Sequence, residues 1–155
     1  MPFGLIQVLS GTVGSICFAM LFNIRGRRLA VSAVGGFLSW SFYLLFELLT
    51  KNEVLSYFIV AALITAYAEC MARVVKTPTT TFIMAALIPL IPGASLYYTM
   101  TSAFSGDLTL FGNKAVYTLE LAAALALGVI TASAVAKGIF AGIKRWRSRL
   151  TNNEQ

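Results

Sequence analysis

The sequence of 155 residues contains no histidine and only two cysteines. Without histidine, the chain has no imidazole to act as a general base, to bind a metal or to activate a nucleophile. Cys17 and Cys70 lie far apart in apolar runs and form no C-x-x-C pair, so they indicate neither a disulfide framework nor a zinc site. The motifs of zinc proteases, P-loop proteins and G-x-S-x-G hydrolases are also missing. We therefore expect no cofactor, no metal and no enzyme.

Charged residues are scarce as well. They make up 12% of the chain, and 58% of the residues are hydrophobic. A soluble domain carries about 25% charged residues, so this chain cannot cover a globular surface with polar groups. The first positive charge, Arg25, comes after an apolar run, which predicts a retained helix rather than a cleaved signal peptide. The composition predicts an integral membrane protein that lies in a lipid bilayer.

Charged residues divide the apolar sequence into blocks that are each close to the ~20 residues needed to cross a bilayer. Lipid leaves helices as the only suitable structure for such blocks, since open strands would carry unpaired edges. We expect an all-α integral membrane protein with a single transmembrane domain over residues 1–143 and a basic cytoplasmic tail at 144–155. The five expected helices cover about 5–22, 29–49, 54–72, 79–101 and 115–137.

The distribution of lysine and arginine predicts the orientation. Most of the positive charges lie in alternate loops: Arg25, Arg27 and Arg28, then Arg73 and Lys76, then the C-terminal "KRWRSRL". The loops of the opposite side carry Lys51 and Lys114. The positive-inside rule places these loops in the cytoplasm and the N-terminus outside the cell (inner) membrane. The basic C-terminal segment is typical of a topology anchor beside the membrane, so we expect no nucleic-acid partner.

The fourth block, "TTTFIMAALIPLIPGASLYYTM", contains helix breakers at its centre. Pro89 and Pro92 have no N–H group to donate, and each ring crowds the carbonyl four residues earlier. Gly93 follows at once. This pattern predicts that the fourth helix is broken at Pro89, Pro92 and Gly93, although a simple proline kink is the alternative.

A helix that restarts after Pro92 leaves the N–H groups of Gly93, Ala94 and Ser95 without intrahelical acceptors. They form the positive end of a half-helix near mid-membrane, which suits a carboxylate. Such discontinuous helices mark substrate sites in secondary transporters. We therefore predict a substrate site made of Pro89, Pro92, Gly93, Ala94 and Ser95, with Tyr97 and Tyr98 shaping its pocket.

Acidic residues within the spans are the second signal, because a carboxylate in a membrane is costly. Glu69 lies four residues before Arg73 and could form an anchoring ion pair or couple transport to protons. Glu120 has no basic residue three or four positions away, and it could couple to protons or extend toward the interface. Glu47 is expected to be solvated near the external boundary.

The segments "FAMLFNIRGRRLAVSAVGGFLSW" and "IPLIPGASLYYTM" resemble the threonine/serine exporter family. The likeness extends over roughly residues 15–137. The size is similar to the small five-span subunit of split exporters, such as that of bacterial succinate exporters. A proline that often follows "FN" in the family is absent here.

The resemblance implies a secondary-transporter subunit that exports threonine and serine, or a dicarboxylate such as succinate. It also implies a larger membrane subunit of the same family as a partner. The alternative is a structural or regulatory subunit with no substrate site. Rows of small residues, such as Gly128, Ala132 and Ala136, could pack within the chain or against a partner, including a second copy.

Overall fold

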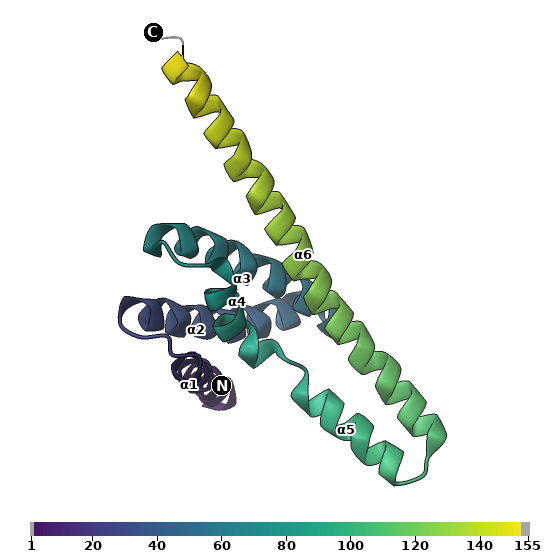
Figure 1. Ribbon diagram of the computed structural model, residues 1–155. Coiled ribbons are helices and arrows are strands. Elements are labelled where there is room, and N and C mark those ends of the chain that lie inside the picture. The colour runs from purple at the N-terminus through teal and green to yellow at the C-terminus, as the bar shows by residue number, and fades with distance from the viewer. Residues whose placement is uncertain (1, 153–155) are drawn as a thin grey trace.

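The structure is a computed structural model that describes the backbone of residues 2–152 and the side chains of residues 4–142. In the described residues all regular structure is helical, which confirms the all-α fold (Figure 1). The helices are α1 (Pro2–Leu21), α2 (Arg27–Thr50), α3 (Glu53–Val75), α4 (Thr79–Leu87), the short 3₁₀ helix η1 (Ile88–Leu90), α5 (Gly93–Phe104) and α6 (Leu108–Asn152).

Four of these helices, α1, α2, α3 and α6, are each long and apolar enough to cross a membrane. The fifth crossing is a bent pair, in which α4 and η1 form the first half and α5 forms the second half. The two halves meet at an angle of 57°. The expected set of five spans with a broken fourth span is therefore confirmed in the described part of the chain.

Short turns connect the first four helices and are specified locally. Asn23, Lys51 and Lys76 each adopt the left-handed conformation that ends a helix. The side chain of Asn52 accepts a hydrogen bond from the N–H of Leu55 and caps the start of α3. These turns let α1, α2, α3 and α4 pack against one another as a bundle.

Close packing in the bundle depends on small residues. Gly36 of α2 lies directly against Ser15 of α1, so that any side chain at position 36 would collide with it. A methyl group added at Gly128 of α6 would lie 2.6 Å from the carbonyl oxygen of Phe58 in α3. The small residue at 128 therefore serves packing within the chain.

The last two helices form a hairpin that extends beyond the bundle. In Figure 1, α5 runs beside the first half of α6. A turn at Gly106, with φ +78°, and a cap from the Asp107 side chain to the N–H of Leu110 connect them. The hairpin meets the bundle through the packing of α6 on α3 and through the break itself.

The expected bounds of the last helix differ most from the structure. Residues 108–114 were expected in a loop, and the helix was expected to cover about 115–137. Instead α6 starts at Leu108, because Asp107 is a strong helix cap and Gly112 is accommodated inside the helix. The helix also continues through the expected basic tail as far as Asn152. The side chains of that tail, 144–155, lie outside the described residues.

Candidate functional site

Two residues between η1 and α5 leave the helical conformation: Ile91 is extended and Pro92 forms a tight turn. Ile91 has φ −63° and ψ 123°, and Pro92 has φ −73° and ψ 58°. The N–H of Gly93 donates to the carbonyl of Ile91 at 2.6 Å, and the N–H of Leu96 donates to the carbonyl of Pro92 at 3.0 Å. The break is thus a true interruption rather than a kink. It also corrects one expectation, because the Gly93 donor is already paired in the tight turn.

The other two expected donors are open. Among the described residues, no acceptor pairs with the N–H of Ala94 or Ser95, and no side chain caps α5. Ala94 is exposed and Ser95 is partly buried. The helix of 12 residues that begins here adds its positive dipole end to these two N–H groups. This end of α5 can bind an anionic group.

The start of α5 borders a cavity of about 390 Å³. This volume is within the range of small-molecule sites. Four segments of the chain form its walls. They are Gln7 of α1; Trp40, Tyr43, Leu44 and Glu47 of α2; Glu53 and Tyr57 of α3; and Pro89, Ile91, Pro92, Gly93, Ala94 and Ser95 at the break.

Two carboxylates line this cavity, those of Glu47 and Glu53. Glu53 accepts a hydrogen bond from the hydroxyl of Tyr43 at 3.2 Å and another from the hydroxyl of Tyr117 in α6. The ring of Tyr43 packs edge-on against Tyr57, with 5.3 Å between the ring centroids. The Glu53 carboxylate is therefore held at the cavity wall by groups from α2 and α6.

Sequence reasoning missed both acids of the cavity. Glu47 was expected to be solvated, and Glu53 fell in the connection between the expected helices at 29–49 and 54–72. The signal that could have found them is the two-residue turn between α2 and α3, at Lys51 and Asn52. A turn this short brings the last residues of α2 and the first residue of α3 to the same end of the bundle.

The two tyrosines expected in the pocket lie elsewhere. Tyr97 is 66% exposed and Tyr98 is 56% exposed, and neither lines the cavity at the break. The helical period of about 100° per residue turns Tyr97 to the opposite face from Ser95, whereas Tyr98 lies one helical turn beyond Ser95, outside the cavity at the break. Tyr98 instead lines a neighbouring cavity, together with Ser95 and Lys114.

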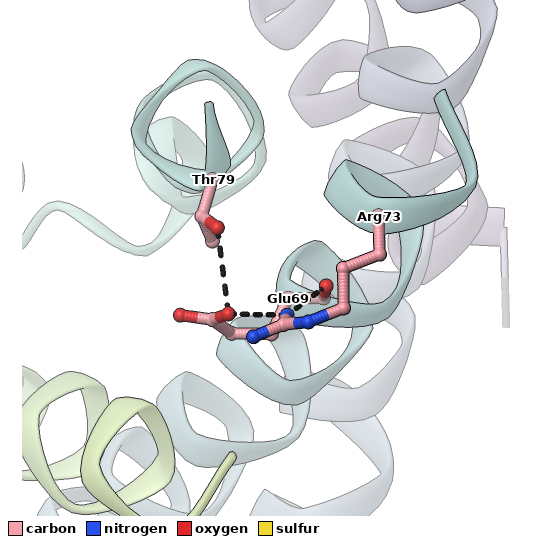
Figure 2. A network of polar contacts seen from close by, with 3 residues as sticks. All are labelled: Glu69, Arg73 and Thr79. Atoms are coloured by element: carbon pink, nitrogen blue, oxygen red, sulfur yellow. Dashed lines mark hydrogen bonds and ion pairs between the residues drawn. The ribbon is translucent and has the colours of Figure 1, made fainter. Parts of the chain in front are cut away.

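Glu69 is placed in a structural ion pair. Its side chain is almost fully buried, and its Oε2 atom lies 2.6 Å from a guanidinium nitrogen of Arg73 (Figure 2). The hydroxyl of Thr79, the first residue of α4, donates to the same oxygen at 3.4 Å. The Arg73 guanidinium also lies 3.6 Å from the ring centroid of Phe140 in α6. Glu69 thereby joins three helices at the end of α3 that is remote from Glu53.

Glu120 lies in a different groove. It is exposed on α6 and borders a cavity of about 470 Å³ between α3 and α6, together with Asn52 and Phe58. Neither Glu69 nor Glu120 lines the cavity at the break. The proton-coupling role suggested for these two residues stays a prediction.

A multi-pass membrane chain with a broken span beside a polar cavity has the architecture of a secondary transporter. Comparison with protein families agrees with this class. The family model described as "Threonine/Serine exporter, ThrE" matches residues 7–135, and the chain belongs to this family of transporters. Comparisons with curated proteins and with solved structures gave no match.

Proposed function

We propose that this chain is part of a secondary transporter that exports small amino acids such as threonine and serine. We further propose that the cavity at the broken fourth span binds the substrate. One observation carries the proposal: the open donors of Ala94 and Ser95 and the carboxylates of Glu47 and Glu53 line the same cavity.

The N–H donors and the carboxylates of this cavity are complementary to the two charged ends of an amino acid. The substrate carboxylate accepts hydrogen bonds from the N–H groups of Ala94 and Ser95, where the α5 dipole favours negative charge. The substrate ammonium lies toward Glu47 and Glu53 and makes charge-assisted hydrogen bonds. The aromatic side chains of Trp40 and Tyr57 complete the walls.

The same cavity disfavours a dicarboxylate such as succinate. One of its carboxylates could occupy the start of α5, but the other would then face Glu47 and Glu53. Like charges this close in a site of reduced dielectric repel each other. We therefore propose an amino acid as the substrate.

We also propose a larger membrane subunit of the same family as the partner. In this chain alone, Gly93 and Ala94 are exposed at the break. Lipid cannot satisfy an open backbone donor, so either protein or water must cover this side. A partner that covers the cavity would meet this need, and a second copy of the chain is the other occupant to test. We propose an inner-membrane location with the N-terminus outside.

Uptake of labelled threonine and succinate into inverted membrane vesicles tests this function. The vesicles are prepared from cells of the native host, so that they contain the full chain together with the other membrane proteins of that host. Glu53→Gln should raise the KM for threonine roughly tenfold, because a neutral amide binds the ammonium more weakly. Glu53→Asp, which keeps the negative charge, is the comparison variant, and we expect it to keep most of the affinity.

Two outcomes would contradict the proposal. Preferential accumulation of succinate over threonine would exclude the assigned substrate class. Full threonine uptake by vesicles that lack only this chain would instead show that the partner alone carries the site. The chain would then have the structural or regulatory role.

A further inference from the structure

A second, smaller cavity of about 220 Å³ lies beside the cavity at the break. It is lined by Ser95, Tyr98, Lys114, Tyr117 and Thr118. Ser95 also lines the first cavity, so the start of α5 borders both. The two cavities are therefore neighbours that share one wall residue.

The charge of the second cavity is opposite to that of the first. Lys114 lines it, and its ammonium lies 5.2 Å from the ring centroid of Tyr98. Among the residues that the structure describes, no carboxylate forms an ion pair with Lys114. Its backbone carbonyl accepts a hydrogen bond from the hydroxyl of Thr118 at 2.8 Å, and that hydroxyl also pairs with Thr99 of α5 at 3.0 Å. The hairpin thus holds an unpaired cation at this cavity.

A hydrogen bond links the walls of the two cavities. The hydroxyl of Tyr117, which lines the second cavity, donates to Glu53, which lines the first. This bond joins α6 to α3 close to Ser95. An ammonium group that binds Glu53 would compete with Tyr117 for the carboxylate oxygen, because charge-assisted hydrogen bonds are the stronger kind.

We propose that the cavity at Lys114 is a second station for the carboxylate of the substrate, and that the Glu53–Tyr117 hydrogen bond is the gate between the two cavities. This inference rests on the proposed function. The substrate ammonium displaces Tyr117 from Glu53, and the carboxylate then passes from the N–H groups at the start of α5 to the ammonium of Lys114. No covalent bond forms or breaks.

The station is tested with Lys114→Met in the same inverted vesicles, with the amount of chain in the membrane measured by immunoblot. The KM for threonine should rise roughly tenfold. The inhibition constant of threonine amide, which keeps the ammonium but has no carboxylate, should not change. Lys114→Arg should keep most of the affinity. Lys137→Met is the matched control, because Lys137 is exposed on the same helix.

An unchanged KM for threonine in Lys114→Met would overturn the station. An equal loss of affinity for threonine and its amide would overturn it as well, since the effect would then not involve the carboxylate. Wild-type vesicles that take up no threonine would instead refute the proposed function, and this inference with it.

The gate is tested with Tyr117→Phe, which keeps the ring and removes only the hydroxyl. Vesicles loaded with threonine should then lose it several times faster than wild-type vesicles when no driving gradient is applied. Efflux at the wild-type rate would show that the Glu53–Tyr117 bond does not separate the two cavities.

Discussion

At the scale of single residues, the environment of each glutamate decides what it can do. Glu69 is 3% exposed and is paired with Arg73 and Thr79. Its carboxylate does not line the cavity at the break. Glu53 is only partly buried, accepts hydrogen bonds from two tyrosine hydroxyls and lines the cavity at the break. The same side chain is therefore an anchor at one end of α3 and a candidate ligand at the other.

We predict that Glu69→Gln destabilises the protein without weakening substrate binding. The change leaves the Arg73 guanidinium without its charged partner, which should cost about 1–3 kcal/mol, since Arg73 is only half-buried. The midpoint of thermal unfolding in detergent should fall, while the KM for threonine stays the same. Glu120→Gln, on an exposed surface, is the control for the unfolding measurement. A changed KM at unchanged stability would assign Glu69 to transport instead.

At the scale of elements, the broken span is the decisive feature. Its two halves, Thr79–Leu90 and Gly93–Phe104, are each too short to cross a bilayer, at about 18 Å of helix for a core of about 30 Å. Together the two halves can cross the hydrocarbon core, and their junction places backbone N–H donors within the bilayer. The bend of 57° turns α5 away from α4 and toward α6.

We predict that replacing Pro92 by Ala together with Gly93 by Leu abolishes export while the protein stays in the membrane. Both replacements favour a continuous helix, because proline costs about 3 kcal/mol and glycine about 1 kcal/mol within a helix. A continuous helix pairs the donors of Ala94 and Ser95 and removes the proposed carboxylate site.

The measurements for the double variant are threonine efflux from cells and the amount of chain in isolated membranes. Gly112→Leu is the matched control, since a Cβ atom added at Gly112 of α6 would have nothing within 4 Å. Wild-type efflux by the double variant would remove the assignment of the site to the break.

At the scale of the whole molecule, the alternation of the helices sorts the connecting turns to two ends of the bundle. The turn between α1 and α2 and the turn between α3 and α4 lie at the same end (Figure 1). Arg25 and Lys76 are in these turns, and Arg27 and Arg73 are in the adjoining helix turns. One end of the bundle is therefore strongly basic, which supports the proposed orientation.

We predict that a single cysteine at Ser105 reacts with a membrane-impermeant maleimide in intact cells, whereas one at Arg25 reacts only after the cells are opened. The background protein carries Cys17→Ser and Cys70→Ser, so that only the new thiol is labelled. Mass spectrometry of the purified chain measures the labelling. The reverse pattern would show that the basic end faces outward and would invert the topology.

Much of the fold could be predicted because its signals are local. Apolar length sets the spans, and the absence of N–H groups at Pro89 and Pro92 sets the break. The start of α6 was predicted wrongly, at about residue 115, because the helix cap at Asp107 was overlooked. In the site, the open donors of Ala94 and Ser95 were predicted correctly, while the pairing of Gly93 within the turn was not.

By itself the sequence determined that this chain lies in a membrane, that it crosses about five times and that the fourth crossing is interrupted. These properties depend on neighbouring residues and on the chemistry of the backbone. Only the tertiary structure decided which side chains accompany the break. Glu53 and Tyr117 are 64 positions apart in the chain, and the packing of α6 on α3 brings them together. Hydropathy cannot predict such a tertiary contact, because it describes how each residue interacts with solvent and not which helix packs beside it.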